Sequence, residues 1–336
     1  MKQTKLLGGV VFALAVCLLV TVPTSTCAQI VWKMTHKMPP ESAEGKAFQR
    51  FADLVKEKSG GKMLVKIFPA EQLGKTEAVL EMLENGTLQV YPEGETYLQK
   101  YVDELKFSNL PFVFENREHY ARFINSPRVK GWVEKVRREH NIMIVGNVAD
   151  FVRGPYRVMV SKKPVTSLAD VRGLKLRLHP DELSIAVWRE LGANTIVLAW
   201  TEIYESMSRG IIEACNSPMA LVESMKFYEV AKYIIRHDEF PQGMAFMTSA
   251  KDFEALSPEL KKVVVDAVKG AGDFSAEIME KQAQESIARM EKKGAKFSII
   301  DRKPFMEKVA KLYAQMEAEG KMPKGLIAEI QALSKK

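Results

Sequence analysis

The sequence predicts an α/β protein with enough chain for two domains. Patterns of strands and helices alternate over residues 30–86 and recur after residue 150. The length of 336 residues suits two α/β domains of ordinary size. A helical pattern over 257–294, at about 1.5 Å per residue, is longer than one small domain. The composition, 46% apolar and 27% charged, is that of a globular chain and excludes a disordered or multi-span membrane protein.

The first 28 residues have the pattern of a secretory signal peptide. Lys2 and Lys5 precede an apolar run over 6–22, and small residues lead from Pro23 to Ala28. We expect cleavage near Ala28 and export of the remaining chain. An uncleaved anchor is the alternative, because the apolar run is nearly long enough to span a bilayer. Cleavage removes two lysines and no acids, so the formal net charge falls from +7 to +5.

The rest of the chain has no pattern typical of nucleic-acid binding. Charges of both signs are mixed, as in EKKGAKFSIIDRK (291–303), and no block interleaves basic with aromatic residues. No second apolar run is long enough to cross a membrane. After cleavage Cys215 would be the one remaining cysteine, so we expect a fold that depends on its core and has no internal disulfide.

The first alternation of strands and helices predicts a mainly parallel sheet. Predicted strands cover 30–36 and 63–69, and predicted helices cover 41–62 and 74–86. Phe48, Phe51 and Val55 lie on one face of the first helix, and Gly60-Gly61 ends it. Strand, helix, strand and helix at this spacing form a βαβ unit.

The alternation recurs in the second half of the chain. Predicted strands cover 156–161, 174–178 and 195–200, and predicted helices cover 167–173, 184–191 and 201–210. Ser167 and Asp170 have the spacing of a capping box. We expect the long helix over 257–294 to run along both domains and brace them, with a bend at the Gly-Ala-Gly sequence 270–272.

No pattern of catalytic or metal-binding residues is present. The histidines, at positions 36, 119, 140, 179 and 237, include no pair with metal-ligand spacing on one helix. The sequence has no glycine-rich nucleotide loop, no GxSxG and no CxxC. A lone Cys215 is more often a core residue than a nucleophile. We therefore expect a binding protein that is not an enzyme and needs neither a metal nor an organic cofactor.

Arg177 lies in a short strand pattern, GLKLRLHP (173–180). Leu174, Leu176 and Leu178 alternate with charged residues, as in a half-buried strand. This pattern alone leaves two interpretations open, a solvated charge on the strand or a ligand-binding group, of which the solvated charge is the more common.

Three separated stretches, 51–74, 163–178 and 191–234, resemble the DctP-type solute-binding proteins of tripartite ATP-independent periplasmic (TRAP) transporters. The third stretch contains the Glu-Ile-Tyr helix and the Phe-Tyr-Glu-Val segment common in that family. The resemblance implies a periplasmic-binding-protein-like fold, with a ligand cleft between two α/β domains that crossing strands and the long helix connect. The expected domains are 29–153 plus about 243–282, and 154–242 plus about 283–336.

The resemblance also implies a function. We expect a periplasmic protein that captures a small organic acid and delivers it to integral-membrane TRAP transporter subunits, which use an ion gradient and not ATP. Two alternatives stay open: a secreted enzyme acting on a small carboxylic acid, and a periplasmic ligand-sensing module.

In the family, the arginine at the position of Arg177 holds the ligand carboxylate, and a second arginine one strand earlier matches Arg157. A guanidinium offers a planar pair of donors that fits a carboxylate, which an ammonium cannot reproduce. The resemblance therefore favours the ligand-binding interpretation of Arg177.

The chain departs from the family pattern near this site. Ser217 stands where many members have an asparagine, and we expect Asn216 to supply the amide instead. Ser217-Pro218 is also a predicted N-cap for a helix over 218–230, whose free N–H groups favour an anion.

Further candidates come from the strand ends. Trp200, Tyr91, Glu93 and His36 are possible cleft residues, although Trp200 also suits the core and Glu93 also suits the surface. A serine in place of asparagine, with Tyr91 and Trp200 nearby, favours a bulkier or aromatic acid over a C4 dicarboxylate. The number of ligand carboxylates, one or two, stays open.

Overall fold

The structure is a computed structural model that describes residues 29–151 and 153–334. The predicted signal peptide, residues 1–28, lies outside the described residues. Within them, no helix is both long enough and apolar enough to cross a membrane.

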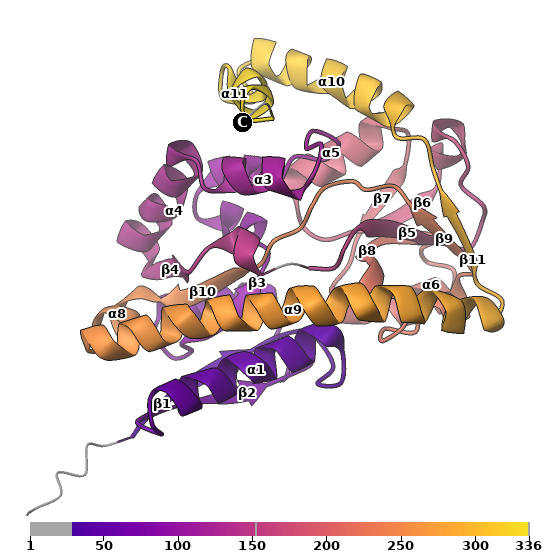
Figure 1. Cartoon of the computed structure of the whole chain (residues 1–336). Coiled ribbons are helices and arrows are strands. Elements are labelled where there is room, and N and C mark those ends of the chain that lie inside the picture. The colour runs from indigo at the N-terminus through magenta and orange to yellow at the C-terminus, as the bar shows by residue number, and fades with distance from the viewer. Residues whose placement is uncertain (1–28, 152, 335–336) are drawn as a thin grey trace, which may run out of the picture.

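Two β-sheets organise the structure (Figure 1). The first has the order β2-β1-β3-β10-β4, with β1 parallel to β2 and β3, and β10 antiparallel to β3 and β4. Its strands are β1 (Ile30–Thr35), β2 (Met63–Phe68), β3 (Val90–Glu93), β4 (Ile142–Val145) and β10 (Ala245–Ser249). The predicted parallel βαβ start of the chain is thus confirmed, and β10 joins the sheet from far along the sequence.

The second sheet has the order β11-β9-β5-β8-β6-β7. Its strands are β5 (Arg157–Ser161), β6 (Lys175–Leu178), β7 (Asn194–Val197), β8 (Ala214–Pro218), β9 (Tyr233–Arg236) and β11 (Lys296–Ile299). Strand β6 is parallel to β7 and β8, whereas β5 is antiparallel to β8 and β9. The α/β fold class is confirmed.

Helices cover both sheets. They are α1 (Ala43–Lys58), α2 (Thr76–Glu84), α3 (Arg117–Ile124), α4 (Pro127–His140), α5 (Glu182–Glu190), α6 (Ile203–Ser208), α7 (Phe227–Val230), α8 (Ala250–Glu254), α9 (Pro258–Lys292), α10 (Lys303–Ala318) and α11 (Leu326–Ala332). Short 3₁₀ helices include η1 (Glu95–Lys100), η3 (Val148–Asp150), η4 (Leu168–Val171), η5 (Trp200–Glu202) and η6 (Met219–Leu221).

Helix α1 forms because its sequence provides a cap and one apolar face. The Ser42 side chain accepts a hydrogen bond from the Gly45 N–H, and Phe48, Phe51 and Val55 are fully buried. The helix packs along α9 and the first sheet, and their apolar side chains form one core cluster.

Helix α9 has 35 residues and runs past both sheets, which agrees with the expected bracing helix (Figure 1). It is helical without interruption through 270–272, and the bend expected there stays a prediction. A Cβ added at Gly272 would lie 2.3 Å from the Asp150 carbonyl oxygen. This glycine therefore allows the chain between the sheets to approach the helix closely.

The chain passes between the sheets in two segments, 146–151 with 153–156 after β4, which includes η3, and 237–244 after β9. Two predicted domain boundaries, 153/154 and 242/243, fall in these crossing segments, and the third, at about 282/283, falls within α9; all three stay predictions. The C-terminal residues contact both halves. Helix α10 packs against α5, whereas α11 lies on α3, where His119 Nε2 is 2.7 Å from the Ile330 carbonyl oxygen.

The predicted helix over 218–230 is wrong. Ser217 and Pro218 end strand β8, where they are paired with Val158 and Arg157 of β5. The Ser217 hydroxyl donates to the Pro218 carbonyl oxygen and caps no helix. Tertiary pairing of β8 overrides the local N-cap signal, so the α-helix begins only at Phe227. Strand β7 likewise ends at Val197, before Trp200.

Candidate ligand-binding site

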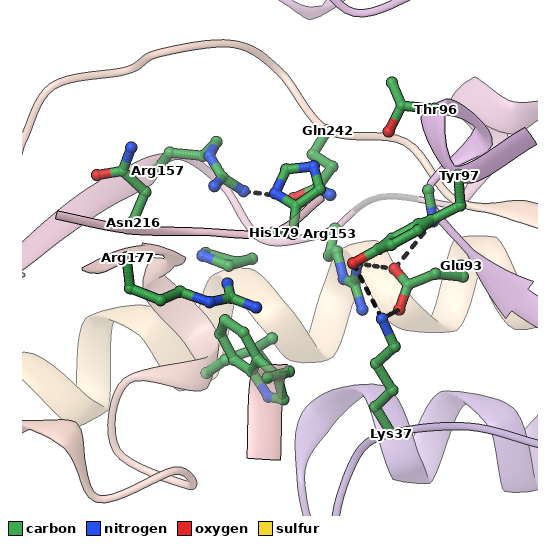
Figure 2. A pocket seen from close by; sticks show the side chains of 14 residues that line it. Lys37, Glu93, Thr96, Tyr97, Arg153, Arg157, Arg177, His179, Asn216 and Gln242 are labelled. Atoms are coloured by element: carbon green, nitrogen blue, oxygen red, sulfur yellow. Dashed lines mark hydrogen bonds and ion pairs between the residues drawn. The ribbon is translucent and has the colours of Figure 1, made fainter. Parts of the chain in front are cut away.

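A cavity of about 40 Å³ lies where the two sheets and the crossing segments meet (Figure 2). The first sheet and the chain after it contribute Lys37, Glu93, Gly94, Thr96 and Tyr97. The second sheet and the chain that follows its strands contribute Arg157, Arg177, His179, Trp200, Asn216, Pro218 and Leu221. Arg153 and Gln242 come from the crossing segments.

Arg177 is buried at this cavity, with 4% of its surface exposed, which excludes the solvated interpretation. Its Nε and Nη2 donate to the Leu198 carbonyl oxygen at 2.9 and 2.6 Å, which fixes the guanidinium at the end of β6. The ring centroid of Trp200 lies 5.7 Å from it. Burial lowers the pKa of Arg177 because a charged group loses solvation there.

Among the described residues that line the cavity, Arg177 is the cation without a carboxylate partner. No carboxylate oxygen of a described residue lies within 4.0 Å of it, whereas Lys37, Arg153 and Arg157 each pair with a glutamate. His179 lies 3.3 Å from an Asp181 oxygen. Figure 2 shows the Arg177 side chain reaching toward the middle of the group without a dashed contact to another drawn residue.

Arg157, by contrast, is already paired. Its Nε lies 3.2 Å from Glu239 Oε2, and its guanidinium lies 4.5 Å from the Phe240 ring centroid. Burial lowers the pKa of Arg157, although Glu239 opposes the shift. Glu239 also accepts hydrogen bonds from Trp188 Nε1 and, at 3.2 Å, from Asn216 Nδ2. Arg157 is thus held in a closed network.

The opposite wall is a buried network of two cations and two carboxylates. Arg153 binds Glu44 through Nε at 2.6 Å and Nη2 at 3.0 Å, and it also contacts Glu93. Lys37 Nζ lies 3.0 Å from the second Glu93 oxygen and donates to the Tyr97 hydroxyl at 3.0 Å. Burial alone would raise the pKa of Glu93, but the charges of Arg153 and Lys37 outweigh it and hold that pKa well below its ordinary value.

Two buried polar atoms at the cavity have no hydrogen-bond partner among the described residues. They are Trp200 Nε1, a donor, and Asn216 Oδ1, an acceptor. Most buried polar groups in proteins are hydrogen-bonded, since an unpaired one is costly. Both atoms therefore have unused hydrogen-bonding capacity.

The structure brings together five of the eight residues predicted from the sequence: Arg177, Arg157, Asn216, Trp200 and Glu93. Three do not line the cavity. Ser217 is fully buried on the other face of β8, because successive side chains of a strand alternate and Asn216 takes the cavity side. Tyr91 is buried in the core, with its hydroxyl 3.1 Å from Thr76 Oγ1.

His36 is buried behind the first wall, which is the network of Lys37, Arg153, Glu44 and Glu93. Its ring centroid lies 4.7 Å from that of Phe48. Its Nδ1 accepts a hydrogen bond from the Met38 N–H, and burial lowers the pKa of His36 to about 4. The imidazole is therefore neutral at pH 7, and it packs in the core instead of lining the cavity.

Six polar cavity residues were not predicted: Lys37, Thr96, Tyr97, Arg153, His179 and Gln242. His179 could have been predicted to line the cavity, because it follows Arg177 by two residues and so lies on the same face of the chain. Lys37 follows the end of a predicted strand. Arg153 and Gln242 lie in crossing segments, which have no periodicity that could reveal their orientation.

The described residues include no arrangement of three or more His, Cys, Asp or Glu side chains that could hold a metal ion. Cys215 is fully buried, and burial raises its pKa to about 12. It is a neutral thiol at pH 7, with no role as an ionised nucleophile.

The chain is similar in sequence to known proteins. Residues 34–319 match the family of bacterial extracellular solute-binding proteins, family 7, or DctP. The 2,3-diketo-L-gulonate-binding periplasmic protein YiaO of Escherichia coli is 26% identical over 90% of this chain and 91% of its own.

Solved structures have the same fold. One is a TRAP periplasmic solute-binding protein from Actinobacillus succinogenes with bound L-galactonate, which matches this chain with a TM-score of 0.82. The two sequences are 25% identical, and the match covers 91% of this chain and 99% of the other. One from Ochrobacterium anthropi with bound L-fuconate has a TM-score of 0.84, 22% identity and coverage of 91% and 100%. The sheets, the cavity between them and the match over 34–319 together confirm the predicted resemblance: the chain belongs to the DctP family of bacterial extracellular solute-binding proteins, the solute-binding proteins of TRAP transporters.

Proposed function

We propose that this protein binds a small sugar acid in the cavity, through a carboxylate contact with Arg177, and delivers it to the membrane subunits of a TRAP transporter for ion-gradient-driven uptake. The observation that carries the proposal is the buried Arg177 guanidinium, which has no carboxylate within 4.0 Å among the described residues. A buried charge without a counter-ion is costly, and a bound carboxylate would compensate it.

The charge balance of the cavity favours one ligand carboxylate. Arg157 is paired with Glu239, and the two cations of the opposite wall are paired with Glu44 and Glu93. A second carboxylate would have to displace one of these pairs. This argues against a dicarboxylate and favours one ligand carboxylate, a number that the sequence left open.

The remainder of the cavity suits hydroxyl groups. Glu93 offers a carboxylate acceptor, the Trp200 Nε1 and Asn216 Oδ1 atoms lack partners, and Tyr97 and Thr96 offer hydroxyls. A polyhydroxy acid matches this mixture of donors and acceptors better than an aromatic acid. Tyr91, which was part of the reason to expect an aromatic acid, lies outside the cavity. Relatives named for 2,3-diketo-L-gulonate and L-galactonate support the same class.

Delivery to a transporter requires export, so the proposal includes cleavage near Ala28 and a mature protein that begins near Gln29. The mass of the protein recovered from the periplasm tests this step. A retained 1–28 segment would contradict it. Loss of uptake on gene deletion separates transport from ligand sensing, the alternative that shares the same binding step.

The ligand class can be tested directly. Native mass spectrometry of the purified protein should reveal a bound, chemically unchanged sugar acid. Titration calorimetry with L-galactonate, L-fuconate, D-glucuronate, succinate and an aromatic acid should give binding to one or more sugar acids. Tight binding of succinate or the aromatic acid alone would overturn the proposed class, and recovery of a converted product would favour the enzyme alternative.

A further inference from the structure

A second cavity, of about 240 Å³, adjoins the crossing segments. Its wall combines the start of α3, residues 154–157 and 236–242 of the crossing region, and Arg302 at the start of α10. It shares Arg153, Arg157 and Gln242 with the ligand cavity but reaches none of the other residues that line it.

Two arginines at this second cavity lack a carboxylate partner. Arg117 donates from Nη2 to the Gly154 carbonyl oxygen at 3.1 Å, and no carboxylate oxygen lies within 4.0 Å of it among the described residues. The same holds for Arg302, whose Nε is buried without a hydrogen-bond partner. Burial lowers the pKa of both side chains and outweighs the opposing charges of Glu118 and Glu280 on Arg117 and of Asp238 on Arg302, none of which forms an ion pair with its arginine.

The other charges nearby do not neutralise these two. Arg236 binds Asp238 through Nε, at 3.0 and 2.9 Å to its two oxygens, and lies 4.1 Å from the Tyr156 ring centroid. Of the two acidic residues that line the cavity, Asp238 is therefore occupied, and Glu115 is exposed to solvent.

The first turn of α3 adds to the positive potential. Asn116 and Arg117 both line the cavity, and the Asn116 side chain caps only the His119 N–H. The remaining N–H groups of this turn carry the partial positive charge of a helix N-terminus.

We propose that this cavity is a second anion site, which binds a small oxyanion (a phosphate or a carboxylate) between Arg117 and Arg302. The site is separate from the ligand cavity, because neither arginine lines that cavity and Arg177 does not line this one. Two guanidinium groups provide forked donors that suit the oxygens of either anion.

The test must separate the two sites. Inorganic phosphate and malonate are each titrated calorimetrically into the wild type, the Arg177→Ala variant and the Arg117→Gln/Arg302→Gln variant. The matched control is Arg138→Gln/Arg172→Gln, which removes the same charge from two exposed arginines elsewhere. Which of the two anions binds more tightly identifies the favoured chemistry.

We expect at least one of these anions to bind the wild type, Arg177→Ala and the control with equal affinity within about twofold, and the Arg117→Gln/Arg302→Gln variant at least about tenfold more weakly. Binding that disappears with Arg177→Ala would place the anion in the ligand cavity and overturn the proposal. So would the absence of binding of both anions to the wild type up to about 10 mM.

Retained affinity for the sugar acid shows that the double variant is folded. If the double variant does not fold, the single variants Arg117→Gln and Arg302→Gln are used. An unchanged anion affinity in both single variants overturns the proposal. Because sugar-acid binding is measured in the same variants, failure of this second site is distinguishable from failure of the proposed function.

Discussion

The two walls of the ligand cavity use buried charge in opposite ways. On the first wall Lys37, Arg153, Glu44 and Glu93 neutralise one another. On the second wall Arg177 is equally buried, yet among the described residues its side chain donates only to the Leu198 backbone carbonyl. Burial therefore does not distinguish a structural charge from a ligand-binding one, whereas the presence of a counter-ion does. The predictions below test this contrast.

The largest expected effect on stability is in the first wall. Arg153→Ala leaves Glu44 and Glu93 buried with only Lys37 to compensate them, so the free energy of unfolding should fall by about 3–5 kcal/mol. Chemical denaturation measures it, with Lys175→Ala, an exposed residue of β6, as the control. A loss below about 1 kcal/mol would show that this network is not structural.

The largest expected effect on binding is in the second wall. Arg177→Ala should weaken sugar-acid binding by about 3–5 kcal/mol, which takes a micromolar dissociation constant to millimolar or weaker. Arg177→Lys should recover only part, because an ammonium lacks the fork. The free energy of unfolding without ligand should change by less than about 1 kcal/mol, since no ion pair is broken. A large destabilisation by Arg177→Ala would show that Arg177 stabilises the fold as Arg153 does, and would contradict the contrast between the two walls.

An intermediate effect concerns His36 behind the first wall. Its pKa is about 4 in the folded protein and 6.5 ordinarily, so the unfolded chain takes up the proton first and stability is lost as pH falls from 6.5 toward 4. Between pH 8 and 5 the wild type should lose about 2 kcal/mol more than His36→Phe. Denaturation of both proteins at each pH measures the difference. Parallel pH profiles would show that His36 is not held neutral.

The smallest expected effect concerns Trp200 in the second wall. Trp200→Phe removes the unpartnered Nε1 donor but keeps a ring against Phe227, which lies 5.3 Å away between centroids. If the ligand accepts this hydrogen bond, its affinity should fall by about 1 kcal/mol, or about fivefold. Calorimetry with the bound sugar acid measures it, and an unchanged affinity would show that the ligand does not use this donor.

The sequence predicted the elements with strong periodicity and missed those that tertiary contacts decide. Helices α1 and α9 and strand β6 follow from apolar spacing and caps. Strand β8 was missed because Ser217-Pro218 looks locally like a helix start, and only pairing with β5 makes it a strand end. The position of β10 in the first sheet depends on pairing between residues more than 100 positions apart in the sequence, which no local pattern reveals.

The candidate site was predicted in the same uneven way. Arg177, Arg157 and Asn216 were predicted from the family resemblance, because the strand pattern alone left the role of Arg177 open, and all three line the cavity. Arg153 and Gln242 come from irregular crossing segments and gave no signal. Arg157 pairs with Glu239, which is 82 positions away in the sequence. Only the folded structure therefore reveals that Arg157 already has a carboxylate partner.

The contact between Arg177 and the ligand carboxylate is tested most directly by changing both partners. Titration calorimetry would compare an acid, galactonate, with galactitol, which has a hydroxymethyl group in place of its carboxylate, against the wild type and Arg177→Ala. If Arg177 holds the carboxylate, replacing the acid by the alcohol should cost at least about 2 kcal/mol more in the wild type than in the variant. Equal costs in the two proteins would show that the carboxylate binds elsewhere and would contradict the account.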